Sequence, residues 1–147
     1  MKRPILLALF LLILIVAGWY GYNKLYGKVE PLHNTQSDFT LTANELIMAF
    51  EKDSALANKQ YLGKIITITG SVKSVEKDTD AATVVLGKED GMSSVRCSMD
   101  SSQVGAVSNL QAGSSVTIKG ACTGFHADDM GLGSDVVLNR CILETTK

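Results

Sequence analysis

The sequence is poor in the residue types on which nucleic-acid binders usually depend. Only 6% of its 147 residues are aromatic, and it holds two prolines, three cysteines and two histidines. From Lys28 onward there are 11 Lys and Arg against 15 Asp and Glu, a formal net charge of −4. Because neutralisation of phosphates by basic side chains supplies most non-specific affinity for nucleic acids, this balance argues against a nucleic-acid partner.

Motifs for catalysis and for metal binding are missing as well. The sequence has no glycine-rich phosphate loop and no glycine-framed serine nucleophile. Adjacent carboxylates such as Asp128 and Asp129 do not by themselves flank a scissile bond, and the cysteines and histidines lack the close spacing of zinc ligands. We therefore expect no enzyme, no cofactor and no metal ion.

A long apolar run stands near the N-terminus. Residues 5–17 contain no polar side chain, Lys2 and Arg3 precede them, and residues 18–22 include three aromatics. Such a run is typical of a cleaved signal peptide or of a retained signal anchor. The aromatics replace the small residues of a cleavage site and suit the lipid–water boundary, which favours a transmembrane anchor over residues 1–22. The basic start predicts a cytoplasmic N-terminus in the inner membrane, with the remainder in the periplasm.

A linker and one domain are expected after the anchor. Residues 23–40 show no periodicity and contain turn-forming residues, so they are interpreted as a linker, and residues 41–147 as the domain. Thr42 and Glu45 have the spacing of a capping box, which predicts that a helix begins there. That helix is expected to fade between Asp53 and Gln60.

From Gly63 onward the apolar residues alternate, which predicts strands. The expected strands are 64–77, 83–86, 94–99, 116–123 and 135–144, with a short helix over 101–110 and a glycine- and aspartate-rich loop over 124–134. Gly70 is the expected bend of the long first strand. Five strands with a helix between the third and fourth are the plan of the oligonucleotide/oligosaccharide-binding (OB) barrel, so the fold class is mainly β.

Several short motifs fit one family of OB domains. They are Lys59-x-Tyr61-x-Gly63-Lys64-x-Ile66, Gly70-x-Val72, Cys97-Ser98-Met99, Gly120-x-Cys122-Thr123-Gly124-Phe125 and Asp135-Val136-Val137-Leu138-x-x-Cys141. Over about residues 44–144 the chain resembles the tRNA-anticodon-binding-like OB family, which consists largely of exported or membrane-anchored bacterial proteins. The resemblance implies the fold and little about activity, because the family's name records a likeness of fold and not demonstrated tRNA binding.

The cysteines are expected to include one disulfide, because a pair of cysteines tends to oxidise in an extracytoplasmic compartment. Cys122 and Cys141 are the candidates, since they flank the connection from the fourth to the fifth strand. The resemblance also pairs a cysteine after the fourth-strand glycine with one late in the fifth strand. Cys97 would then be a buried free thiol. The alternative is three unpaired buried thiols.

The loop between the fourth and fifth strands is the stretch that most resembles a binding site. Phe125 and Met130 would offer an apolar surface, while His126, Asp128 and Asp129 would offer hydrogen bonds or oxygens for a calcium ion. Lys73 and Arg96 would add a small basic spot on the strands. The alternative is a solvated, turn-rich loop without a ligand.

These features together predict a membrane-anchored, non-enzymatic OB module that binds an envelope protein or a glycan at the barrel rim. One alternative is an assembly module that only supports a larger complex. Another is oligonucleotide binding, but the second and third strands, the usual binding face, contain no aromatic side chain on which bases could stack.

Overall fold

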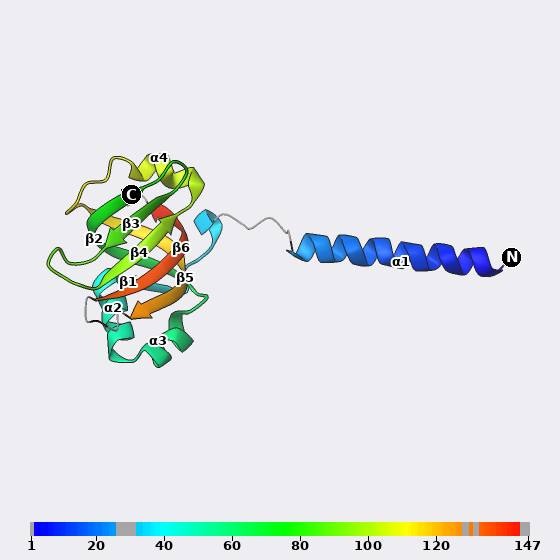
Figure 1. The fold of residues 1–147 in the computed structure, drawn as a ribbon, viewed down its shortest axis with the longest axis horizontal. Coiled ribbons are helices and arrows are strands. Elements are labelled where there is room, and N and C mark those ends of the chain that lie inside the picture. Colours follow the sequence, from blue (N-terminus) through cyan, green and yellow to red (C-terminus); the bar gives the residue numbers. More distant parts are fainter. Residues whose placement is uncertain (1, 26–31, 128–129, 131–132, 145–147) are drawn as a thin grey trace. The chain divides into compact units, whose positions relative to one another are not determined.

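The computed structural model describes residues 2–25, 32–127, 130 and 133–144, which belong to two units, residues 1–31 and 32–147. The first unit contains helix α1, Lys2–Leu25 (Figure 1). Its side chains from Leu11 to Val16 are apolar and 55–63% exposed. Among the residues that the structure describes, no helix combines the length and the apolar character needed to cross a bilayer. The anchor expected over residues 1–22 stays a prediction.

The second unit is a closed β-barrel of five strands. The barrel strands are β2 (Ile65–Lys77), β3 (Ala82–Leu86), β4 (Ser94–Met99), β5 (Ser115–Ala127) and β6 (Ser134–Glu144). Strand β2 pairs with β3 and with β5, β3 pairs with β4, and β5 pairs with β6, all antiparallel. The parallel pairing of β4 with β6 closes the barrel (Figure 1). The mainly β, OB-type fold expected from the sequence is confirmed.

The long strand β2 changes partners at its bend. Up to Ser71 it pairs with β5, and from Val72 it pairs with β3. Gly70 precedes this change, and a Cβ added to it would lie 2.9 Å from the Cβ of Ala43. The missing side chain therefore lets helix α2, Ala43–Lys52, begin directly against β2 at this point.

A short additional strand, β1 (Phe39–Thr42), pairs in parallel with the first half of β2. The sequence interpretation assigned residues 39 and 40 to the linker. The structure also places a 3-10 turn, Leu32–Asn34, before this strand, and Leu32 is only 4% exposed. Parallel pairing joins segments that are distant in the sequence, so the four residues of β1 carried no local signal of their own.

Helix α2, Ala43–Lys52, begins at the expected capping box. The Glu45 N–H donates to the Thr42 hydroxyl at 3.2 Å, and the Thr42 N–H donates to the Glu45 carboxylate at 2.7 Å. The expectation that helical structure fades between Asp53 and Gln60 is wrong. The Asp53 carboxylate accepts from the Leu56 N–H at 3.0 Å and starts a second helix, α3, Ser54–Tyr61, over this stretch.

The helix expected between the third and fourth barrel strands is present in two short pieces. A 3-10 turn, Ser101–Gln103, leads into α4, Val104–Val107. In Figure 1, α4 lies at one end of the barrel, and α2 and α3 lie toward the other. The helical turn therefore covers one opening, and the two longer helices cover the other.

The start of the expected loop over 124–134 is corrected, because β5 extends through Ala127. Its last residues pair with β6 from Gly124 opposite Val137 to Ala127 opposite Ser134. Phe125 and His126 are therefore strand residues. The glycine and aspartate content of this stretch suggested a turn, but cross-strand pairing determines the conformation of its first four residues.

The expected disulfide between Cys122 and Cys141 is also absent, since all three cysteines are free and buried. Cys122 stands opposite Leu138 on β6, whereas Cys141 lies three residues further along. The irregular register around Gly120 directs the Cys141 sulfur to that glycine, where it lies 2.5 Å from the position of an added Cβ. The two cysteines flank the same connection but do not face one another.

Candidate functional site

Three hollows follow one another along α2. The first, of about 410 Å³, lies where α2 begins and the bend of β2 meets the β3–β4 connection. The second, of about 200 Å³, lies between the middle of α2 and the β3–β4 connection, and the third, of about 450 Å³, lies between the end of α2 and strands β5 and β6. Asn44 and Lys88 line both the first and the second, and Glu51 lines both the second and the third. We name this row of hollows the α2 groove.

One serine fixes the wall of the groove at its middle. The Ser93 hydroxyl donates to the Glu51 carboxylate at 2.5 Å, and it accepts from the Ser134 N–H at 3.2 Å. The neighbouring Ser94 is buried and donates to the Asp135 carboxylate at 2.5 Å. The helix, the β3–β4 connection and the start of β6 are therefore joined by side-chain hydrogen bonds.

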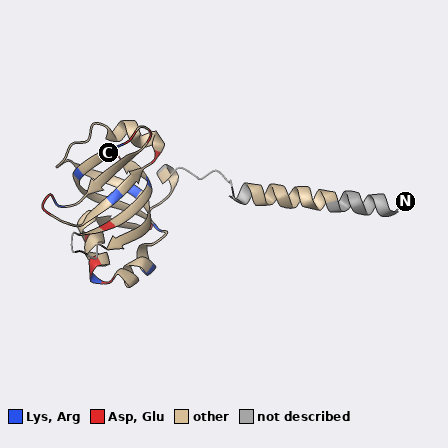
Figure 2. Ribbon diagram, in the orientation of Figure 1, with Lys and Arg blue, Asp and Glu red and all other residues tan. Residues whose placement is uncertain are grey.

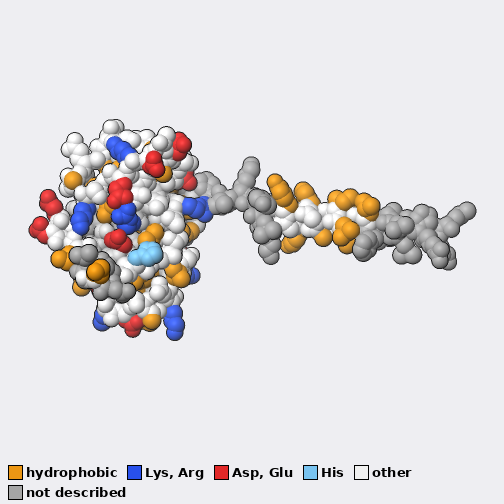
Figure 3. Space-filling view, viewed as in Figure 1, with side chains coloured by type: hydrophobic (Ala, Val, Ile, Leu, Met, Phe, Trp, Pro, Cys, Tyr) orange, Lys and Arg blue, Asp and Glu red, His pale blue; other side chains and the backbone are white. Residues whose placement is uncertain are grey.

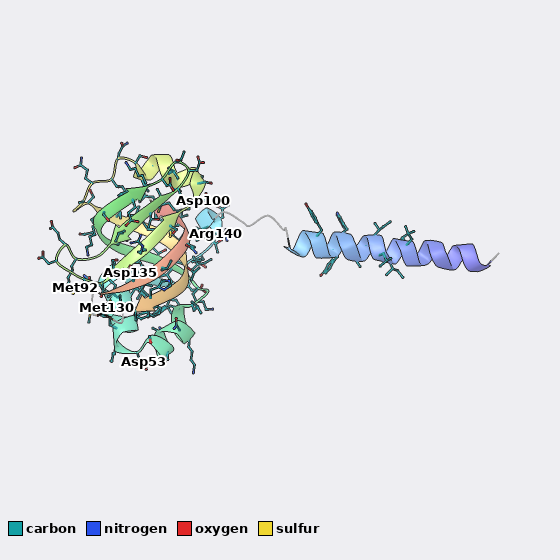
Figure 4. The ribbon with its side chains drawn as sticks, in the orientation of Figure 1. Asp53, Met92, Asp100, Met130, Asp135 and Arg140 are labelled. Carbon is teal, nitrogen blue, oxygen red and sulfur yellow. The ribbon has the colours of Figure 1, made fainter. Side chains whose placement is uncertain are left out.

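Exposed methionines gather at this side of the barrel. Met48 on α2 is 65% exposed and Met92 on the β3–β4 connection is 70% exposed, and both line the second hollow. Met130, on the β5–β6 connection, is 84% exposed. Figure 4 shows Met92 and Met130 at the same edge of the barrel, and the two connections touch, because a side chain at Gly133 would collide with the Met92 backbone. Methionine is flexible and polarizable, which suits contact with irregular apolar surfaces.

Charges of both signs line the groove. Lys73 is half-buried and donates to the Gly91 carbonyl at 2.5 Å, so its ammonium group already has a partner. Lys88 and Glu89 line the first hollow, and Lys52 and Asp53 line the third. Figures 2 and 3 show basic and acidic residues interspersed on the visible face of the folded unit. The groove is therefore not a continuous basic track of the kind that follows a phosphate backbone.

The acidic start of α2 is held ionised by its cap. Hydrogen bonds from the backbone N–H and the hydroxyl of Thr42 lower the pKa of Glu45 below its ordinary value. A carboxylate at this position also opposes the positive end of the helix dipole. The N-terminus of α2 is therefore already neutralised by the protein's own side chain.

The aromatic side chains of the folded unit pack on one another. Phe39 meets Tyr61 edge to face at 5.1 Å between ring centroids, Tyr61 lies 6.1 Å from Phe50, and Phe50 stacks on Phe125 at 4.9 Å. These are the four aromatic residues described from residue 32 onward. Their rings pack on one another in the core and at its border. None of them lies on β3 or β4, where a ring could stack on a base or a sugar.

The structure brings two of the predicted site residues to the groove. Phe125 lines the third hollow beside Phe50, and Lys73 lines the first. Met130 lies on the connection that borders the groove, and His126 is exposed near the end of β5.

The remaining predicted site residues lie elsewhere. Arg96, on β4, forms an ion pair with Glu76 at 2.5 Å and does not line the groove. Asp128 and Asp129 lie outside the described residues. Among the His, Cys, Asp and Glu that are described, no group of three could hold a metal ion.

The sequence interpretation missed the centre of the groove. It did not single out Asn44, Met48, Glu51, Lys88 or Met92. One local signal existed, since Met48 lies three residues from both Glu45 and Glu51 and so is an apolar residue on the charged face of α2. The other members come from a separate connection, and nothing in their spacing indicates a shared surface.

Comparisons with known proteins address the family and the fold. A family model described as tRNA_anti-like matches residues 1–142. No curated protein matches the sequence. A solved structure from Klebsiella pneumoniae, described as a "putative nucleic acid-binding lipoprotein", is 17% identical, with 71% of this chain and 91% of that chain covered and a TM-score of 0.56. Aspartyl tRNA synthetase from Entamoeba histolytica is also 17% identical, with 79% of this chain but only 23% of the synthetase covered and a TM-score of 0.48. At this level of identity the Klebsiella structure shows a common fold alone.

Proposed function

Because this chain belongs to the tRNA_anti-like family, whose OB-fold domains bind rather than catalyse, we propose that it is a membrane-anchored binding module that holds a segment of another exported protein in the α2 groove. The observation that carries this proposal is the continuity of the three hollows along α2, with Met48 and Met92 exposed at their centre. A protein partner is favoured because apolar, polar and charged side chains all line the groove.

The dimensions of the groove suit an extended peptide. Helix α2 has 10 residues, so it is about 15 Å long at about 1.5 Å per residue. An extended chain advances about 3.3 Å per residue, so about four to five residues fit alongside it. Exposed methionines would cover apolar side chains of such a segment, while Asn44 and the charged groups would meet its polar ones.

The proposed location rests on the N-terminal segment. Residues 5–17 are uninterruptedly apolar, and two basic residues precede them. The described side chains from Leu11 to Val16 are exposed on α1, where lipid would cover them. With Lys2 and Arg3 on the cytoplasmic side, the barrel lies outside the inner membrane.

A peptide-selection experiment tests the binding proposal. Full-length protein in detergent is screened against displayed random peptides of about seven residues, and the affinities of the enriched peptides are measured by fluorescence polarisation. Met48→Lys and Met92→Lys are expected to weaken binding roughly tenfold, because each places a charge against the apolar part of the peptide. Leu56→Lys is the matched control, since Leu56 is 60% exposed on α3 and does not line the groove.

A labelled single-stranded oligonucleotide serves as the rival ligand. We expect the selected peptides to remain bound in its presence at both low and high salt. Selection of the same peptides by Met48→Lys protein would contradict the proposed groove. Oligonucleotide binding that weakens steeply with salt would instead support a nucleic-acid function.

A further inference from the structure

Three of the four methionines that the structure describes are exposed to solvent. Met48 on α2, Met92 on the β3–β4 connection and Met130 on the β5–β6 connection are 65–84% exposed. Met99 on β4 is only 7% exposed and belongs to the core of the barrel. The chain therefore offers three accessible thioethers, and a buried one with which they can be compared.

Met48 and Met92 supply most of the exposed apolar surface in the middle of the α2 groove. Both line the second hollow, of about 200 Å³, which has one further large apolar residue, Ile47. Ile47 is buried and belongs to the core. The other side chains that line this hollow are polar or charged. A ligand therefore meets apolar surface there mainly at two methionine side chains.

We propose that Met48 and Met92 are oxidation sites, at which peroxide ends peptide binding in the α2 groove and reduction of the sulfoxides restores it. This inference rests on the peptide-binding function proposed above. Oxidation converts the flexible apolar side chain of methionine into a polar sulfoxide. An apolar side chain of the peptide would then cover a polar oxygen and remove its water, which costs free energy unless a hydrogen bond replaces that water.

The reaction balances with hydrogen peroxide as the oxidant. A lone pair of the methionine sulfur attacks one peroxide oxygen, the O–O bond breaks and an S–O bond forms. The proton of the transferred oxygen passes to the departing hydroxide, which leaves as water. The sulfur loses two electrons and the peroxide gains them. Two thiols of a reductant reverse the step, since they remove the oxygen as water and become a disulfide.

Exposure predicts which methionines react in the folded protein. The three exposed side chains can meet peroxide without unfolding, whereas Met99 is covered by the barrel. Met130 lies at the same edge of the barrel as Met92 (Figure 4), but it lines none of the three hollows. Its oxidation is therefore expected to leave peptide binding unchanged, which makes Met130 the matched control.

Peptide mapping of the full-length protein in peroxide-free detergent tests the sites. The protein is treated with hydrogen peroxide, digested with trypsin and analysed by tandem mass spectrometry. Cleavage at lysine and arginine places the four methionines on separate peptides, 29–52, 89–96, 97–119 and 120–140. The three exposed methionines should each gain one oxygen roughly ten times as fast as Met99, in proportion to their exposure. Oxidation of Met99 as fast as Met48 and Met92 would overturn the proposed sites.

Affinity measurements test the effect on binding. Peptides selected by the unoxidised protein are titrated by fluorescence polarisation against the protein before and after peroxide treatment. We expect oxidation to weaken binding at least about tenfold, and sulfoxide reductases for both epimers, with dithiothreitol, to restore it. Met130→Leu protein should lose affinity on oxidation as the wild type does. Protein with both Met48→Leu and Met92→Leu should have the same affinity before and after peroxide, because leucine has no sulfur to oxidise.

The failure of this inference and the failure of the binding function give different results. If wild-type protein with sulfoxide at both Met48 and Met92 binds the peptides as tightly as before, the oxidation switch is overturned while the binding function stands. Peroxide sensitivity that persists in the double leucine variant would also overturn the switch, since other groups would then cause it. If the unoxidised protein selects no peptide, the binding function fails and the switch fails with it.

Discussion

At the residue scale, Gly120 sets the position of a buried sulfur. It lies on β5 where the register with β6 is irregular. A Cβ at this position would lie 2.5 Å from the Cys141 sulfur and 3.2 Å from the Leu138 Cβ. The absence of a side chain therefore leaves room for the Cys141 sulfur in the core.

Gly120→Ala is expected to destabilise the fold by roughly 2 kcal/mol, because one added methyl group overfills a packed interior. The measurement is urea unfolding of the full-length chain under reducing conditions, so that oxidation does not contribute. Gly124→Ala is the matched control on the same strand, since nothing lies within 4 Å of its added Cβ. It should change the free energy of unfolding by less than about 1 kcal/mol. Equal effects of the two substitutions would refute the packing argument.

At the scale of elements, Asp53 forms the junction between the helices α2 and α3. Its N–H donates to the Ala49 carbonyl at the end of α2, and its carboxylate accepts from the Leu56 N–H at the start of α3. Figure 4 shows Asp53 at the helical end of the domain, and the residue also lines the third hollow of the α2 groove. One residue thus closes α2 with its backbone, caps α3 with its side chain and lines the groove.

Asp53→Ala is expected to lower the free energy of unfolding by about 1 kcal/mol, because the first turn of α3 loses its side-chain cap. Thermal or urea unfolding provides the measurement. Asp53→Asn keeps an oxygen that can accept the same hydrogen bond, so it should be nearly neutral. If Asn destabilises the protein as much as Ala does, the carboxylate acts through its charge and not through capping.

The elements that the sequence predicted correctly are those with a local pattern. Alternating side chains indicate β2, β3 and β4, and the capping box indicates the start of α2. Strand β1 could not be predicted, because its four residues gain their conformation from pairing with β2. The α2 groove was missed for the same reason, since its walls come from α2, from two connections and from β5, and only their packing brings them together.

At the scale of the whole molecule, the N-terminal helix and the barrel differ in the exposure of their apolar side chains. The first unit exposes apolar side chains on α1, and the second encloses its own core. A family match over residues 1–142 includes both. A membrane-fractionation experiment can therefore test whether the N-terminal helix anchors the protein.

The full-length protein is expected to stay in the membrane fraction after washing with high salt, because apolar insertion does not depend on ionic contacts. The measurement is immunoblotting of washed membranes and supernatant. Leu12→Arg combined with Leu14→Arg is the matched variant, since each arginine costs about 2.5 to 3.5 kcal/mol at the centre of a span. It should reduce the membrane-bound share. Release of a shortened wild-type species would show that the segment is a cleaved signal peptide.

The parallel pairing of β4 with β6 also has a consequence for synthesis. Strand β6 pairs with both β4 and β5, so no ring of five strands exists until residues 134–144 have left the ribosome. At about 5 to 20 residues per second, roughly two to nine seconds pass between the completion of β4 at Met99 and that of β6 at Glu144. During this interval the nascent chain has no closed core, and a translocation channel that accepts only unfolded polypeptide can still pass it.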